Sequence, residues 1–196
     1  NEYKPVEIHH LRLAFEEITG EDLNWFFNQW FLSAGHPVLK VEKEYIDSLN
    51  LLRVNVSQLQ EGDNVPNVYI LPTDIEIVRS DGKKEVLPIT INLRKQSFEF
   101  EMEEAPLLVN LDAEKSLLAE IDQEFNAEEA VVLYEKGGNF LDRYYAIQVL
   151  KRETDSSSLA VIKRALNDPH WKIRAYAIEG IENLVASEAE GSFIKL

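Results

Sequence analysis

The chain has 196 residues, of which 45% are hydrophobic and 10% aromatic, with no cysteine and a formal net charge of −15 at pH 7. This composition supplies enough apolar side chains for packed cores and excludes an intrinsically disordered chain. The absence of cysteine excludes a disulfide scaffold, thiol catalysis and thiolate zinc sites. It leaves the cellular compartment unknown, because a cysteine-free protein works in reducing and oxidising surroundings alike.

The acidic excess is spread along the whole sequence. Residues 1–36, 37–112 and 113–196 carry net charges of −4, −6 and −5. No basic face is hidden behind the total, so we expect no nucleic-acid partner and no binding to anionic lipid. No apolar run approaches the length of a membrane span, and no signal peptide opens the sequence. Because the first residue is Asn1 and the single methionine is Met102, we expect the sequence to be a piece of a longer protein.

Residues 5–34 predict two helices. The first has a broad apolar face and ends at Gly20, and Thr19 is a candidate cap for the second, over Glu21–Leu32. At 100° per residue, one sector of the second helix collects five apolar side chains: Leu23, Phe26, Phe27, Trp30 and Phe31. Trp25 points outside this sector. We therefore expect the helix to need two neighbours, and Trp25 to be exposed or in a contact between chains.

Residues 37–112 change to a period of two, which predicts strands. Apolar residues alternate with polar ones in several runs, such as Leu52, Val54, Val56 and Ile89, Ile91, Leu93. The turn Ser80–Lys83 predicts a hairpin. Six or seven such strands are typical of an antiparallel β-sandwich. Residues 113–124 are ambiguous, with one more extended piece expected around Leu117–Ile121.

The helical period returns at Asn126 and contains an internal repeat of 31 residues. Five positions of one helix match five of another: Phe140, Arg143, Ala146, Ile147 and Leu150 match Trp171, Arg174, Ala177, Ile178 and Ile181. Repeated helix pairs at this spacing indicate an α-solenoid, here of the HEAT type.

The repeat makes specific predictions. Residues 126–186 form two stacked helical hairpins, with Ala146 and Ala177 where helices approach closely. Phe140 and Trp171 each cover the neighbouring hairpin. Because two units lack a stabilising continuation, we expect this region to open before the sandwich.

The sequence contains no recognisable active site. No His-Glu-x-x-His is present, and His9 and Glu16 share a helix face but lie about 10.5 Å apart, too far to bind one metal. The carboxylate pair Glu128–Glu129 diverges on a helix, as do Glu16–Glu17, while Glu103–Glu104 diverge on a strand, so solvated faces are expected rather than acid–base pairs. We predict no catalytic, cofactor-binding or metal-binding residue.

Two clusters leave alternatives open. The aromatic residues 25–31 fit core or interdomain packing, or else a groove that stacks sugars or binds a peptide. Arg143 and Arg174 recur in register, which indicates a structural role within the repeat, with an anion site as the other interpretation.

Several sequence motifs resemble those of one enzyme family. Residues 13–23, followed by Phe27-x-x-Trp30-x-x-x-x-Gly35-x-Pro37, resemble the end of the catalytic domain of gluzincin aminopeptidases, the aminopeptidase N and puromycin-sensitive aminopeptidase relatives. In that family a small β-sandwich follows, and then HEAT-like helices. Gln58-x-Gln60 and residues 69–72 are similar to the sandwich. The family's zinc motif, distal Glu ligand and Gly-x-Met-Glu-Asn loop are not in this sequence.

The resemblance implies a multi-domain α+β chain with three parts. Residues 1–36 are the terminal helices of the catalytic domain, 37–124 the β-sandwich and 125–196 the start of the HEAT-like helices. It implies a zinc aminopeptidase as the parent, which releases N-terminal residues from peptides, and whose catalytic domain this segment contacts. The segment itself shapes or covers the active site and holds no cofactor. The alternative is a non-catalytic scaffold or protein-interaction module of the same superfamily, or an unrelated binding module.

Overall fold

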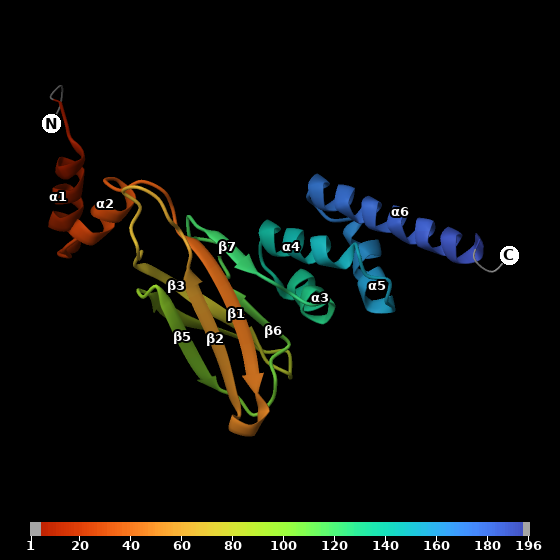
Figure 1. Ribbon diagram of the computed structural model, residues 1–196. Coiled ribbons are helices and arrows are strands. Elements are labelled where there is room, and N and C mark those ends of the chain that lie inside the picture. Colours follow the sequence, from red (N-terminus) through yellow and green to blue (C-terminus); the bar gives the residue numbers. More distant parts are fainter. Residues whose placement is uncertain (1–4, 194–196) are drawn as a thin grey trace.

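A computed structural model describes the backbone of residues 5–193 and the side chains up to residue 182. Figure 1 shows two helices, then a body of β-strands, then a group of helices beside that body. This order confirms the predicted α+β fold class. The first two helices are α1 (Ile8–Thr19) and α2 (Asn24–Trp30).

The strands form two sheets. The first has the order β5-β2-β1-β7 and the second the order β4-β3-β6. Their bounds are β1 Val38–Ile46, β2 Leu51–Gln58, β3 Leu71–Val78, β4 Lys84–Ile91, β5 Lys95–Glu101, β6 Leu108–Leu111 and β7 Glu120–Gln123, with a 3-10 turn at Asp47–Leu49. The two sheets share one hydrophobic core, which we call the sheet core. We call the two sheets together the sheet pair.

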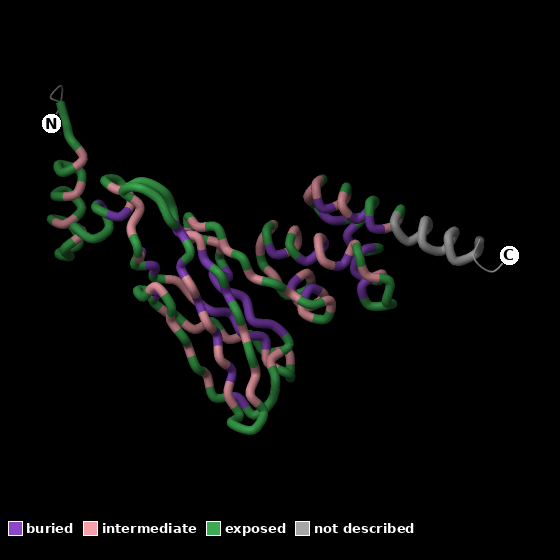
Figure 2. Tube along the Cα trace, viewed as in Figure 1, coloured by how far each residue is buried: buried purple, intermediate pink, exposed green. Residues whose placement is uncertain are grey.

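Alternation explains how the sheet core forms. In β2 every second residue is buried, including Leu52, Val54 and Val56, because successive side chains of a strand point to opposite faces. The predicted turn connects β3 to β4, and its Gly82 adopts φ +80°, a conformation that glycine reaches without a steric penalty. Figure 2 shows the buried residues of the sheets gathered on β1, β2, β3 and β6, whereas β5 and β7 contain none.

One strand differs from the prediction. The expected extended piece around Leu117–Ile121 is β7, which begins at Glu120 and pairs in parallel with β1, with Leu39 opposite Ile121. The other strand pairs are antiparallel, as predicted. The sequence pattern does not reveal this exception, because apolar alternation reports which face is buried and not the direction of the neighbouring strand.

The remaining helices form two hairpins. Helices α3 (Ala127–Lys136) and α4 (Phe140–Leu150) form the first, and α5 (Ser156–Ala165) and α6 (Trp171–Phe193) form the second. α4 contacts α6, and α3 contacts α5. Two stacked hairpins are therefore present, as predicted, although the side chains of residues 183–186 lie outside those described. Their assignment to the HEAT type stays a prediction.

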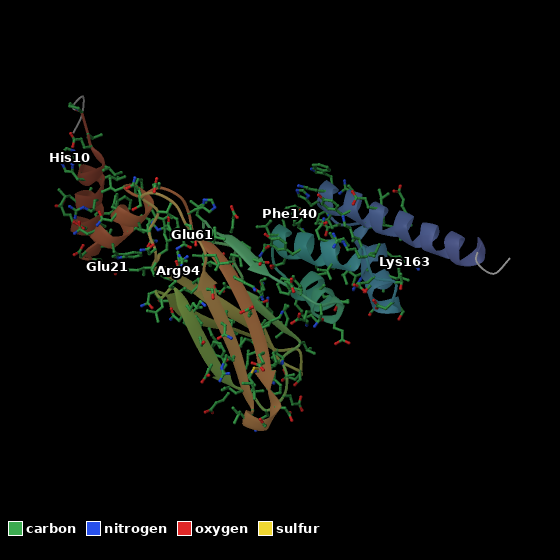
Figure 3. All side chains as sticks on the ribbon, in the orientation of Figure 1. His10, Glu21, Glu61, Arg94, Phe140 and Lys163 are labelled. Atoms are coloured by element: carbon green, nitrogen blue, oxygen red, sulfur yellow. The ribbon has the colours of Figure 1, made fainter. Side chains whose placement is uncertain are left out.

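The 31-residue equivalence holds at the alanines and fails at Ile147 and Ile178, of which the first is fully buried and the second 52% exposed. α4 and α6 begin at the equivalent residues Phe140 and Trp171, and Ala146 and Ala177 are both fully buried. Phe140 covers the second hairpin, with its ring 4.1 Å from that of His170 (Figure 3). The prediction for Trp171 is wrong, because this side chain is 66% exposed. No further hairpin lies against it among the described residues.

The repeated arginines have the structural role that their register indicated. Arg143 Nε donates to the carboxylate of Asp168 at 2.8 Å, which ties the first hairpin to the second. Arg174 donates to the backbone carbonyls of Asp168 and Pro169 at 2.8 and 3.0 Å. Within the part of the chain that the structure covers, no helix combines the length and the apolar character needed to cross a membrane.

Candidate functional site

Helix α1 buries none of its residues, although its sequence is amphipathic. Its apolar side chains, with that of Val6 before it, are open to solvent: Val6, Leu11, Leu13, Phe15 and Ile18. Figure 2 shows the helix projecting from the sheet pair with no buried segment. A helix with an apolar face normally buries that face against another element. The face of α1 therefore lacks a partner within the described chain.

Helix α2 is anchored to the sheets by one polar side chain. The amide of Gln29 accepts from the backbone nitrogen of Ile70 at 2.7 Å and donates to its carbonyl at 3.0 Å. Next to this contact the ring of Trp30 packs 5.6 Å from that of Tyr69. The helix is shorter than predicted and begins at Asn24, so Leu23 takes the cap position. Thr19 lies at the end of α1, where its hydroxyl donates to the Phe15 carbonyl at 2.9 Å and accepts from Glu21 N at 3.3 Å.

The aromatic side chains of α2 lie on more than one side of the helix. Phe27 is buried, while Phe26 and Phe31 are 38% and 49% exposed although they belong to the predicted apolar sector. Trp25 is 36% exposed, which confirms the prediction that one core does not bury all five aromatic rings. Of the predicted sector, Trp30 packs on the sheet core beside Gln29 and Phe27 is buried, while Phe26 and Phe31 stay open.

The irregular segment before β3 is held by glutamine side chains. Gln58 accepts from Tyr69 N at 2.8 Å and donates to its carbonyl at 2.9 Å. Gln60 donates to Gln58 at 3.1 Å and to the carbonyl of Pro66 at 3.2 Å. These amides replace the hydrogen bonds that a neighbouring strand would make, so buried backbone groups stay satisfied. Arg94, labelled in Figure 3, donates from its guanidinium to the carbonyl of Gln60 at 2.9 Å and so holds the start of this segment.

The link between α2 and β1 is equally constrained. Gly35 has φ +75°, and a Cβ atom there would meet Val65 Cγ2 at 2.9 Å. The hydroxyl of Tyr69 donates to the carbonyl of Ala34 at 3.1 Å, and burial raises the pKa of this phenol above its usual value. These contacts fix α2 against the sheet pair.

An apolar groove lies between α2 and the sheets. Its volume is about 520 Å³, and it is lined by residues of α2, of the start of β3 and of the loop before β7, among them Trp25, Phe26, Phe31, Ile70, Leu117 and Leu118. No charged residue lines it, although 28% of the chain is charged. We call this groove with the open face of α1 the N-terminal apolar surface. Loss of charged residues is typical of the centre of a protein–protein contact.

The loop that contributes Leu117 and Leu118 is held in place by one carboxylate. Asp112, almost fully buried, accepts from the backbone nitrogens of Ser116 and Leu117 at 2.9 and 3.0 Å. Leu118 is 73% exposed at the rim of the groove. The groove therefore has two fixed walls, one on α2 and one on this loop.

The titratable side chains do not converge on the groove. His36 pairs with Glu120 at 2.8 Å on the surface, and His10 Nδ1 accepts from Glu7 N at 2.9 Å. Within residues 5–182, no three His, Asp or Glu side chains are grouped so that they could hold a metal ion. Of the carboxylate pairs, Glu16 forms an ion pair with Arg12 of the same helix, and Glu129 forms one with Lys43 of β1.

The sequence predicted the aromatic residues of this surface but not the glutamine side chains that hold it in place. Trp25, Phe26 and Phe31 were visible from their spacing. Gln29 was not, because a glutamine within an apolar helix face looks like an interruption, and Gln58 and Gln60 were noted only for the family resemblance, without a role. The signal that could have found Gln29 is its place between Phe27 and Trp30, where a polar side chain must bond a buried partner.

Comparisons with known proteins show a likeness of fold. The sequence matches no protein-family model, and it matches no curated protein. Among solved structures, the crystal structure of Legionella pneumophila aminopeptidase A in complex with aspartic acid is similar, with a TM-score of 0.69 and 17% sequence identity. The match covers 97% of this chain and 26% of that chain. The chain thus has the fold of about a quarter of that aminopeptidase.

Proposed function

We propose that this chain is the structural, non-catalytic C-terminal part of a larger zinc metallopeptidase that releases N-terminal residues from peptides. In this proposal α1 and α2 complete the catalytic domain, and the sheets and hairpins shape or cover the active site. Two independent observations support it. The fold is similar to part of an aminopeptidase, and residues 13–41 resemble the phrases that close the catalytic domain of the gluzincin family.

The N-terminal apolar surface carries the proposal. Large apolar patches on a protein surface mark contacts, and here a whole helix and an uncharged groove of about 520 Å³ are open. The occupant that fits is the remainder of the parent chain, because this chain corresponds to only 26% of the similar structure. Contact with that larger body would remove from water the apolar side chains that this chain leaves exposed.

In this proposal the zinc site and the steps of the peptidase reaction belong to the rest of the parent chain. No group of three His, Asp or Glu side chains is available among residues 5–182. Zinc and its general base would belong to the rest of the parent. The contribution of this chain would be a fixed wall, since Gln29 and Tyr69 hold α2 rigidly on the sheets.

The first test compares this chain with the longer protein that contains it. We expect the longer protein to bind one zinc ion and to cleave an aminoacyl reporter substrate, and this chain to do neither. Elemental analysis after dialysis against a weak chelator and a fluorogenic assay measure both. Stoichiometric zinc in this chain would contradict the proposal. A longer protein with neither zinc nor activity would support the scaffold alternative.

The second test addresses the apolar surface with a matched pair of variants. Leu13→Asp changes the open face of α1, and Leu49→Asp changes an exposed leucine at the turn between β1 and β2. In this chain both are expected to change the free energy of unfolding by less than about 0.5 kcal/mol. In the longer protein only Leu13→Asp is expected to lower Tm, because it would bury an unpaired charge. Equal effects there would contradict a contact through α1.

A further inference from the structure

The outer face of the second sheet is covered by the first helical hairpin. Ile75 and Ile77 of β3 point into the sheet core, whereas Val78 of the same strand packs in the hydrophobic cluster formed by the helices. Leu108 of β6 does the same, and both side chains are fully buried. The cluster also includes Ala130 and Leu133 of α3 and three residues of α4 (Ala146, Ile147 and Leu150). The sheets and the hairpin therefore share an apolar interface.

A buried polar network crosses this interface. Lys115 Nζ lies 2.8 Å from Asn110 Oδ1 and 3.1 Å from Asp142 Oδ1, and Asn110 Nδ2 donates to the same carboxylate at 3.2 Å. Asn110 and Asp142 are each 1% exposed. Asn139, which precedes α4, donates to the carbonyl of Ala113 at 2.8 Å. A buried ion pair with its hydrogen bonds satisfied holds one specific arrangement of the groups that form it.

Two further lysines connect the sheets to α3. Lys43 of β1 pairs with Glu129 in the first turn of α3 at 2.6 Å, and its ammonium lies 4.6 Å from the ring centre of Phe125. Burial lowers the pKa of Lys43, and the Glu129 carboxylate acts against this shift. Lys84 of β4 bonds the carbonyl of Lys136, the last residue of α3, at 3.1 Å.

The three lysines fix the hairpin at three separate points. Lys43 holds the start of α3, Lys84 its end, and Lys115 the first turn of α4. They start from β1, β4 and the loop after β6, so they reach the hairpin from both sheets. Contacts at three separate points, together with the shared apolar interface, oppose rotation of the hairpin relative to the sheets.

We infer that the sheet pair and the α3–α4 hairpin form one cooperative folding unit and one rigid body. The change from strands to helices near residue 124 is then not a folding boundary. This inference narrows the prediction from the repeat, because only the second hairpin, and not the whole of residues 126–186, would open before the sheets. Helices α5 and α6 pack on the first hairpin and leave Trp171 and Ile178 exposed, so they are the part that opens first. This inference concerns the chain alone and does not depend on the proposed function.

The test is native-state hydrogen exchange of the 196-residue chain, read by mass spectrometry. In the wild-type chain we expect the slowest amides of residues 127–150 to exchange within threefold of those of β3, and residues 156–182 to exchange at least tenfold faster. Asp142→Asn keeps the shape of the side chain and removes the charge that Lys115 faces. We expect it to speed exchange in β3 and in residues 127–150 by the same factor, tenfold or more.

The control is Asp81→Asn, in the exposed turn after β3, which is expected to leave exchange in both segments unchanged. If Asp142→Asn does not fold, Lys43→Met tests the same coupling from β1, because it removes the ion pair with Glu129 and no partner of β3. Residues 127–150 exchanging more than tenfold faster than β3 in the wild-type chain would overturn the inference. So would a variant that speeds exchange in the helices and leaves β3 unchanged.

Discussion

Helices α1 and α4 are close in length and carry similar numbers of large apolar side chains, yet they have opposite environments. α1 buries none of its residues, while α4 buries Ala146, Ile147, Leu150 and Asp142. The second hairpin covers one side of α4 through contacts such as Phe140 with His170. No described element covers the apolar face of α1. Amphipathic spacing therefore predicts that a helix needs a partner, and it does not say whether that partner lies in the same chain.

Truncation of a leucine is expected to show the largest difference in stability between α4 and α1. Leu150→Ala in α4 is expected to reduce the free energy of unfolding by about 2–5 kcal/mol, because a fully buried side chain leaves a cavity. Leu11→Ala in α1, where the side chain is 46% exposed, is expected to change it by less than about 0.5 kcal/mol. Urea titrations followed by circular dichroism measure both. Equal losses would show that α1 packs on this chain after all.

The helix contact at the repeated alanines gives the next effect. Ala177→Leu overfills the close approach of α6 to its neighbours and is expected to cost about 1–3 kcal/mol. Glu179→Leu is the control on the same helix, because its side chain is half exposed and only pairs with Lys151 at 2.9 Å. It is expected to cost less than about 1 kcal/mol. Differential scanning calorimetry compares the two, and a neutral Ala177→Leu would contradict close packing there.

Loss of a helix cap is expected to have a smaller effect on the free energy of unfolding, and it compares α3 with α2. Asn126 caps α3 by accepting from Glu129 N at 2.9 Å, and Asn126→Ala is expected to cost about 1 kcal/mol. Asn28→Ala on exposed α2 removes no cap and serves as the control. Thermal unfolding measures the difference. If both variants unfold at the same temperature, the cap does not contribute to the folding unit that α3 belongs to.

The last effect is a dependence of stability on alkaline pH. Burial, together with the Asp168 carboxylate that its hydroxyl bonds at 3.1 Å, raises the pKa of Tyr134 to about 12. In the unfolded chain the ordinary tyrosine pKa is near 10. The unfolded state loses this proton first, so the stability that the phenol provides is complete below pH 10 and is lost as pH rises from 10 toward 12.

Tyr134→Phe isolates that contribution, with Tyr145→Phe at an exposed tyrosine as its control. The urea midpoint of the wild-type chain is expected to fall more steeply between pH 9 and 11.5 than that of Tyr134→Phe. Tyr145→Phe should follow the wild-type curve. Parallel curves for all three proteins would show that Tyr134 titrates normally in the folded chain.

Local patterns predicted most elements but few of the contacts between them. The alternation of Leu52, Val54 and Val56 predicted β2 with one buried face, and the turn at Ser80–Lys83 predicted the hairpin of β3 and β4. The 31-residue repeat predicted equivalent helices, and Ala146 and Ala177 are both buried at helix contacts. Each prediction rests on a property of neighbouring residues, which is why sequence alone was sufficient.

The candidate surface was predicted only in part. The spacing of Trp25 relative to Phe26 and Phe31 indicated aromatic surface on more than one side of α2, and the structure confirms it. The groove wall from Leu117 and Leu118 was not predicted, because the loop that carries them lies far from α2 in the sequence. Asp112, whose buried carboxylate holds this loop, was not predicted either, because its sequence context does not distinguish it from the many other acidic residues of the chain.

The sequence by itself determined where helices and strands form and which side of each is apolar, because these depend on side chains a few residues apart. Only the tertiary structure decided that β7 runs parallel to β1, that Gln29 bonds Ile70, and that a hairpin covers the outer face of the second sheet. It also decided that α1 has no partner within the described chain. These facts join residues that are distant in the sequence, and periodicity carries no information about which apolar faces meet.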